Sequence, residues 1–175
     1  HHFPELKQFT PEQVAASARR VAPSFIRVEA DEVTYDLHII LRFELERALI
    51  NGDLAVKEVP EAWNARFKEL LGLTVPDHAR GCLQDIHWSM GSLGYFCTYT
   101  LGNLNASQLM RAAHRAHPGL EWELATGTYT NLLSWLRTNI HQAGRTYDPP
   151  ELMQRATGET TQPHYHLEYL RAKFL

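Results

Sequence analysis

The segment from Ala30 to Gly52 constrains the fold most, because it predicts one long helix that is apolar on nearly every side. Asp31 and Glu32 lie near its start, where negative charge favours the positive end of the helix dipole. Asn51 and Gly52 are residue types that end helices in left-handed geometry. Its apolar positions are Val33, Leu37, Ile40, Leu41, Phe43, Leu45, Ala48 and Leu49. A helix that is apolar around most of its circumference is buried, so we expect it at the centre of the fold.

A narrow polar stripe runs along this helix. Thr34, His38 and Arg42 follow one another at intervals of four residues, which places them on one helix face. Such a stripe on a buried helix either lines a cavity or pairs with other buried polar groups. For His38 and Arg42 we favour pairing inside the protein.

The remainder of the chain also predicts helices. Thr10, Pro11 and Gln13 have the spacing of a capping box at the start of a helix that ends before Pro23. Further helices are expected over 61–71, 105–116, 129–144, 150–157 and 163–175, with Trp63 in the core. No alternating pattern of the kind that predicts strands persists. The chain is therefore expected to be all-α, a multi-helix array over residues 3–175 with no internal boundary.

Composition excludes several classes of function. The net charge of −3 gives no reason to expect a nucleic-acid or membrane partner. The two cysteines, Cys82 and Cys97, form no disulfide framework, and a reducing, cytoplasmic location fits them best. No apolar run has membrane-spanning length, and no signal peptide opens the chain. His1 and His2 resemble the end of a purification tag.

A dense polar cluster lies between Gly81 and Gly102. Gln84, Asp85, His87 and Trp88 fall within five residues, and Tyr95 and Tyr99 follow soon after. A carboxylate, an amide, an imidazole and an indole this close together can form a polar site with an aromatic wall. The alternative is a buried helix start whose polar groups satisfy one another. The spacing alone leaves both interpretations open.

Metal-binding patterns are weak. His164 and His166 are two residues apart, and residues at that spacing do not share a helix face. We therefore do not expect them to be a ligand set. The sequence contains neither HExxH nor CxxC.

Two motifs carry a resemblance to a known family. Residues 26–31 match IRxxAD, and residues 81–88 match GxxQDxHW. Both resemble signature motifs of the M32 metallocarboxypeptidases, of the thermostable carboxypeptidase Taq type, and the resemblance extends from Phe3 to Leu175. Enzymes of this family are longer chains that carry HExxH and a downstream glutamate before IRxxAD. The resemblance therefore implies the C-terminal part of a larger helical zinc peptidase fold, with the zinc ligands outside this chain and no metal-ligating residue within it.

The resemblance and the side-chain chemistry together suggest roles for seven residues. Arg27 is the candidate for binding the substrate carboxylate, because a guanidinium pairs with a carboxylate through two hydrogen bonds. The alternative is a structural ion pair with Asp31 or Glu29. The other candidates are His87 with Tyr95 or Tyr99 on the oxyanion side, Gln84 at the substrate backbone, and the supporting carboxylates Asp31 and Asp85. Asp85 would orient either His87 or a zinc-ligating histidine, and Trp88 would form wall or core.

The resulting hypothesis is a part of a zinc-dependent carboxypeptidase that releases single amino acids from peptides with a free C-terminus. Its partners would be those peptides, the N-terminal part of the same protein and a second copy in a homodimer. The 175-residue chain alone is expected to be inactive. The alternative is a catalytically silent helical fragment that acts only as a scaffold or dimerisation surface. In either case we expect exposed apolar surface around Arg27, the long helix and residues 84–99.

Overall fold

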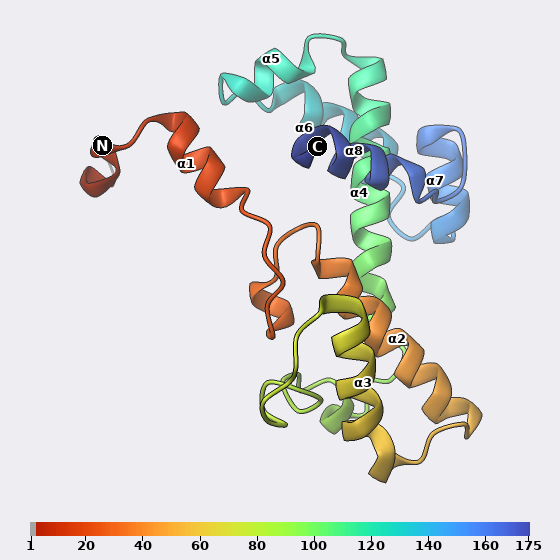
Figure 1. Ribbon diagram of the computed structural model, residues 1–175. Coiled ribbons are helices and arrows are strands. Elements are labelled where there is room, and N and C mark those ends of the chain that lie inside the picture. The colour runs from red at the N-terminus through yellow and green to blue at the C-terminus, as the bar shows by residue number, and fades with distance from the viewer. Residues whose placement is uncertain (1–2) are drawn as a thin grey trace. The chain divides into compact units, whose positions relative to one another are not determined.

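The computed structural model describes residues 3–175, so the expected tag remnant at His1 and His2 lies outside the described residues. The described chain contains helices and no strand, which confirms the all-α prediction (Figure 1). The α-helices are α1 (Pro11–Ala18), α2 (Tyr35–Asn51), α3 (Val59–Leu71), α4 (Cys97–Ala116), α5 (Leu120–Ala125), α6 (Thr130–Leu136), α7 (Pro149–Thr157) and α8 (His164–Phe174). Short 3-10 turns cover Pro4–Gln8, Arg27–Glu29, Val56–Glu58 and Trp88–Met90, and a π-helical turn, Arg137–His141, continues α6.

The contacts of the chain define two compact units. One extends to Cys97 and the other runs from Thr98 to Lys173. The division falls in the first turn of α4 rather than in a linker. The expectation of a chain without a domain boundary stays a prediction.

Helix α1 has the expected start and an earlier end. The Thr10 side chain accepts the Gln13 N–H, and the Gln13 side chain accepts the Thr10 N–H, so the capping box is confirmed. The helix ends at Ala18 instead of continuing toward Pro23. The Ala22 N–H donates 3.0 Å to Asp31 Oδ2 instead of to a helical carbonyl. A contact nine residues away therefore decides the path of the chain after α1.

Helix α2 starts at Tyr35, later than the sequence predicted. Asp31 Oδ1 accepts the N–H groups of Val33 and Thr34, each at 2.9 Å, which forms a capped turn before the helix. The helix ends at Asn51, and Gly52 adopts a φ of 78°. That left-handed geometry suits glycine and confirms the predicted end.

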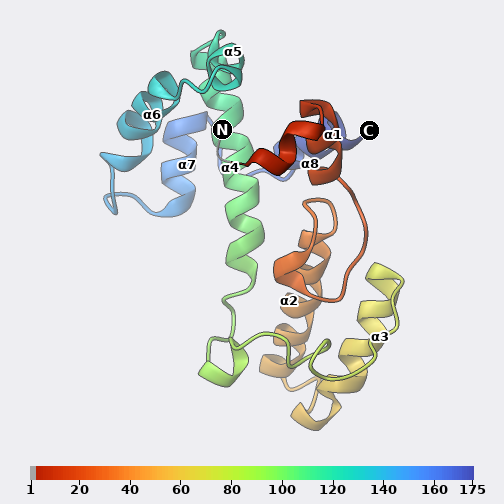
Figure 2. The same ribbon diagram turned by 90° about the vertical axis from the view of Figure 1, so that its left-hand side faces the viewer.

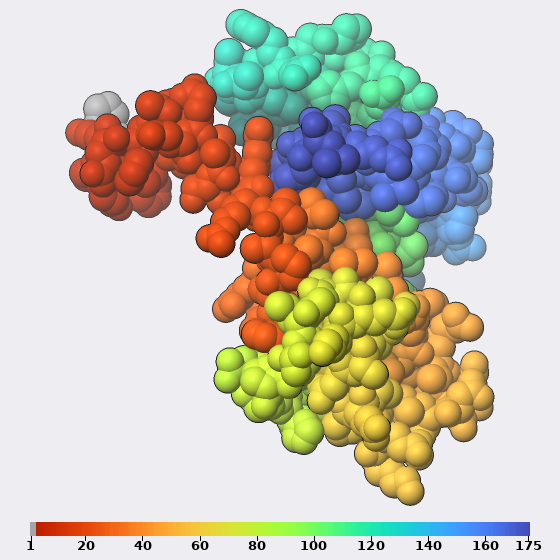
Figure 3. All heavy atoms as spheres, viewed as in Figure 1, coloured from red at the N-terminus to blue at the C-terminus, as the bar shows by residue number. Residues whose placement is uncertain are grey.

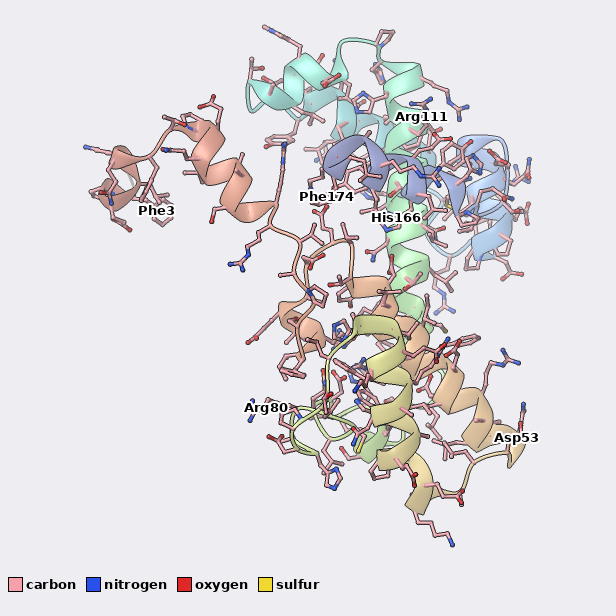
Figure 4. The ribbon with its side chains drawn as sticks, viewed as in Figure 1. Phe3, Asp53, Arg80, Arg111, His166 and Phe174 are labelled. Carbon is pink, nitrogen blue, oxygen red and sulfur yellow. The ribbon has the colours of Figure 1, made fainter. Side chains whose placement is uncertain are left out.

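The core of the first unit lies between α2 and α3. These helices lie side by side in both ribbon views (Figures 1 and 2) and make numerous contacts. Figure 4 labels Asp53 in the turn that joins them. The buried cluster consists of Leu41, Leu45, Trp63, Phe67 and Leu71, so the core position of Trp63 is confirmed. Burying each large apolar side chain contributes about 1.5–3 kcal/mol.

The polar stripe of α2 is buried, as its helix predicted. Arg42 is fully buried and forms an ion pair with Asp85, so the expected internal pairing is confirmed for this residue. His38 is also fully buried, but neither ring nitrogen has a hydrogen-bond partner in the described chain. The expectation of internal pairing was therefore wrong for His38. Its ring instead packs edge-on against Phe67, with the ring centroids 5.6 Å apart.

The second unit has its own core and a buried polar network. Its apolar cluster is Ala112, Ala113, Leu120 and Trp135. Gln108 on α4 is fully buried, and its amide nitrogen donates to Thr157 Oγ1 at 2.8 Å and to the carbonyls of Glu159 and Thr160, each at 3.1 Å. Its amide oxygen accepts the Gln162 N–H at 2.9 Å. Gln108 thus fixes the turn between α7 and α8 against α4.

Candidate functional site

Asp85 bridges two arginines from different segments of the first unit. Arg27 Nε and Nη2 donate to Asp85 Oδ1 at 3.1 and 2.8 Å. Arg42 Nε and Nη2 donate to Asp85 Oδ2 at 2.8 and 2.6 Å. We call Arg27, Arg42 and Asp85 the two-arginine cluster. Through this cluster, the second motif, residues 81–88, contacts both the first motif and α2.

The ion-pair partner of Arg27 is therefore Asp85, where the sequence suggested Asp31 or Glu29 as the structural alternative. Arg27 Nη1 also donates to the hydroxyl of Tyr35 at 3.0 Å. Asp31 serves the local backbone and accepts the hydroxyl of Thr34 at 2.9 Å. Because these bonds favour its ionised form, they lower the pKa of Asp31 although burial opposes them. Asp31 thus shapes the segment that carries Arg27.

The cluster is buried and carries an excess of positive charge. Arg27 is 6% exposed, Arg42 is 0% exposed, and the Asp85 side chain is 12% exposed. Burial would raise the pKa of Asp85, but the hydrogen bonds and charges of both arginines hold it below its ordinary value. Burial lowers the pKa of Arg42 to about 10, against the opposing effect of Asp85, so Arg42 stays protonated near neutral pH. Two cations therefore share one anion.

Gln84 joins the two motifs through their backbones. Its amide oxygen accepts the Arg27 N–H at 2.9 Å, and its amide nitrogen donates to the Phe25 carbonyl at 3.0 Å. The same nitrogen also donates to the carbonyls of Arg80 and Gly81, at 3.1 and 3.2 Å. Gly81 has no room for a side chain, since an added Cβ would lie 2.9 Å from Val75 Cγ1. The role of Gln84 at the substrate backbone stays a prediction, and its visible role is to position Arg27.

Trp88 packs against the core of the first unit, which is one of the two roles, wall or core, that the sequence suggested. Its indole N–H donates to Glu46 Oε1 at 2.8 Å. Its ring packs edge-on against Trp63 and against Phe96, with centroids 6.0 Å apart in each pair. The second motif is thereby fixed to α2 at Asp85 and at Trp88.

His87 lies among aromatic rings. Its ring centroid is 4.3 Å from that of Phe96 and 5.7 Å from that of Tyr95. Both oxygens of Asp85 accept hydrogen bonds from the arginines, and an orienting role of Asp85 toward His87 stays a prediction. Tyr95 is half exposed, and Tyr99 belongs to α4 in the second unit. The oxyanion roles of His87, Tyr95 and Tyr99 stay predictions.

The sequence analysis missed two members of this arrangement. Both lie on α2: Tyr35 contacts Arg27, eight residues before it, and Glu46 contacts Trp88, 42 residues after it. The positions of Arg42 and Glu46, four residues apart on a helix, place them on one face and were the available signal. Their partners could not be identified from that spacing.

A metal does not fit the residues present. Across residues 3–175, no three histidine, cysteine, aspartate or glutamate side chains come close enough to hold a metal ion. His166 Nδ1 instead lies 2.9 Å from Ser107 Oγ on α4 (Figure 4 labels His166). Cys82 and Cys97 are free thiols.

No helix in the described part of the chain is both long enough and apolar enough to cross a membrane.

Apolar side chains are exposed around the cluster within the first unit. The loop after α3 lies at the surface of the molecule in the space-filling view (Figure 3). The exposed apolar residues of the two motifs and the following segment are Val28, Leu83, Ile86, Met90, Leu93 and Tyr95. The first four of these are each about 70% exposed. These side chains lie in the segments where we expected apolar surface, and a continuous apolar surface around Arg27 and residues 84–99 stays a prediction.

Comparison with known proteins gives consistent matches over nearly the whole chain. The family model for carboxypeptidase Taq (M32) metallopeptidase matches residues 1–174. Thermostable carboxypeptidase 1 of Pyrococcus furiosus is 40% identical over 174 residues, which are 99% of this chain and 35% of that protein. Thermostable carboxypeptidase 1 of Thermus thermophilus is 42% identical over 172 residues, 98% of this chain and 34% of that protein.

Solved structures agree with this match. The M32 carboxypeptidase of Deinococcus radiodurans R1 superposes with a TM-score of 0.94 at 44% identity, over 98% of this chain and 35% of that one. A carboxypeptidase structure from Pyrococcus furiosus superposes with a TM-score of 0.95 at 41% identity, over 98% of this chain and 35% of that one. The chain thus spans about a third of the length of the relatives that it matches.

Proposed function

Because the chain belongs to the M32 family of metallopeptidases, we propose that it is the C-terminal part of a zinc-dependent carboxypeptidase that releases single amino acids from peptides. The matched relatives are named as carboxypeptidases. The observation that carries the proposal is the two-arginine cluster at the meeting point of the two motifs. A site with excess positive charge is what recognition of a free C-terminal carboxylate requires.

Arg27 is the residue that we assign to the substrate carboxylate. Its guanidinium is held from two sides, by Asp85 and by the hydroxyl of Tyr35, and its backbone N–H is held by Gln84. A guanidinium fixed in this way loses little rotamer freedom when a second anion binds. The rings of Tyr35 and Phe96 lie 6.0 and 5.7 Å from its guanidinium carbon, and the low exposure of Arg27 strengthens such an ion pair.

His87, Tyr95 and Tyr99 are our candidates on the oxyanion side. An imidazole or phenol hydroxyl aimed at the scissile carbonyl can stabilise the negative charge that develops on its oxygen. The packing of the His87 ring against Phe96 and Tyr95 supports this role, because it restricts the orientation of the imidazole.

The zinc ligands and the general base belong, in this proposal, to the part of the parent protein that this chain does not cover. When bound, such a metal activates water. The roles proposed for residues 27–99 are binding, orientation and stabilisation of the oxyanion. The exposed apolar surface supports a further element of the proposal, which is packing against that other part of the protein. A cytoplasmic homodimer is the expected form of the whole enzyme.

The test is replacement of Arg27 in the full-length parent enzyme. Arg27→Ala should raise KM for peptides with a free C-terminus by at least about tenfold, since a charge-assisted hydrogen bond contributes about 1.5–3 kcal/mol. Arg66→Ala is the matched control, because Arg66 forms ion pairs with Glu44 and Glu69, and neither glutamate belongs to the two motifs. Unchanged KM in Arg27→Ala would remove the assigned role.

A second candidate is a catalytically silent fragment with only a scaffold or dimerisation role. The coverage of about a third of each relative and the lack of a metal-binding group in residues 3–175 favour it for the isolated chain. An assay of the isolated chain with added zinc or cobalt, beside the full-length parent, separates the two. Activity of the parent alone supports the first proposal, and inactivity of both supports the second.

A further inference from the structure

Arg42 occupies an unusual position for a charged residue. It is fully buried within the first unit and faces no solvent. Its Nη1 donates to the His38 carbonyl at 2.7 Å, one turn back along α2. Its guanidinium carbon lies 4.6 Å from the ring centroid of Trp63 and 5.2 Å from that of Phe96. The charge is therefore fixed in place by a helix backbone, two aromatic faces and Asp85.

The cluster contains two arginines and one aspartate, so the buried charge of Arg42 determines its net charge. Asp85 gives one oxygen to each arginine. With Arg27 alone, the pair would be neutral, and the attraction of Arg27 for a second carboxylate would be largely cancelled by Asp85. With Arg42 present, Asp85 can hold Arg27 in place while the group of three keeps one positive charge in excess.

We propose that Arg42 is a positioning residue that supplies this excess positive charge. Asp85 then orients Arg27 without cancelling the attraction of Arg27 for a substrate carboxylate. This inference rests on the proposed function, because it assumes that Arg27 meets the carboxylate. His38, one turn before Arg42 on α2, is not a second source of the charge. His38 is held neutral near pH 7, because burial and the two arginines lower its pKa to about 4.

The experiment measures how strongly the full-length enzyme prefers a carboxylate. The probes are an N-blocked dipeptide acid and the same dipeptide with a C-terminal amide, compared by their inhibition constants against a longer peptide substrate. Arg42→Met and Arg42→Gln should each lower the acid-over-amide preference by about tenfold, as expected for the loss of one nearby charge. Arg42→Lys keeps the charge and should retain most of the preference.

A double variant distinguishes charge from a purely structural effect. Arg42→Met combined with Asp85→Asn restores a single positive charge on Arg27, so it should recover preference for the acid relative to Arg42→Met alone. A purely structural role would make the double variant worse than either single one. Arg66→Met is the control, since it also removes an arginine that pairs with α2.

The outcomes separate this inference from the proposed function. If Arg27→Ala keeps the acid preference, the proposed function fails. If Arg27→Ala loses it while folded Arg42→Met and Arg42→Gln keep it, only the role of Arg42 is overturned. Circular dichroism and the urea unfolding midpoint establish that each variant is folded, and Arg42→Gln retains hydrogen-bonding capacity should Arg42→Met not fold.

Discussion

Arg42 and Asp85 are joined by two hydrogen bonds of 2.8 and 2.6 Å, although 43 residues separate them in the chain. This pair connects the centre of α2 to the second motif. The pair links the helical core to the candidate site, because the Asp85 carboxylate also forms an ion pair with Arg27.

Asp85→Asn should destabilise the chain strongly. The substitution leaves two buried guanidinium groups without a counter-charge, and breaking a buried ion pair from one side costs about 3–5 kcal/mol. Urea unfolding followed by circular dichroism measures the change. Asp77→Asn, which removes an exposed pair with Arg80 at the loop labelled in Figure 4, should cost no more than about 1 kcal/mol. Equal effects of the two substitutions would contradict the buried-pair assignment.

His38 should make stability fall as the pH is lowered. Its pKa is about 4 in the folded chain and near 6.5 when unfolded, so the unfolded chain binds more protons between these values. The contribution is present above pH 6.5 and is lost as the pH falls toward 4. His38→Leu should flatten this part of the pH profile and should not lower stability at pH 7, because it removes two buried nitrogens without partners. The urea midpoint at pH 7 and pH 5 measures both effects, and His78→Leu is the exposed control. An unchanged profile in His38→Leu would refute the assignment.

Gln84→Ala should loosen the junction of the two motifs. The substitution removes the acceptor of the Arg27 N–H and the donor to the Phe25 carbonyl, at a cost of about 1–3 kcal/mol. Hydrogen exchange of the Arg27 amide should become faster, while Gln8→Ala, at an exposed position, should leave it unchanged. Retained protection at Arg27 in Gln84→Ala would show that another group holds this backbone.

Gln108→Ala should affect the second unit. The side chain makes four hydrogen bonds to the turn between α7 and α8, and its loss leaves the buried Thr157 hydroxyl with fewer partners. We expect a loss of about 2 kcal/mol or more in the free energy of unfolding. Proteolysis at residues 158–162 should become faster, whereas Gln142→Ala, on the surface, should change neither measurement. Unchanged cleavage would mean that Gln108 does not hold the turn.

Sequence information predicted the helices where local signals were sufficient. The cap at Thr10 and the end of α2 at Gly52 follow from side-chain capping and from glycine at positive φ, which act within one helical turn. The expected helix over 129–144 became α6 followed by a π-helical turn, and α5 was missed because six residues give little periodic signal. Helix starts were the least accurate, as Tyr35 and Cys97 show.

The sequence by itself determined that this chain is all-helical, that α2 is buried, and that two short motifs belong to the M32 family. These properties follow from local sequence patterns, namely the spacing of apolar side chains and the contiguous residues of each motif. Only the tertiary structure decided that Asp85 binds both Arg27 and Arg42, that Gln84 holds the Arg27 backbone, and that His38 lies buried with no hydrogen-bond partner among residues 3–175. The physical reason is that these contacts join residues about 40–60 positions apart or depend on complete burial, and local periodicity contains no information on which distant side chain fills a given position.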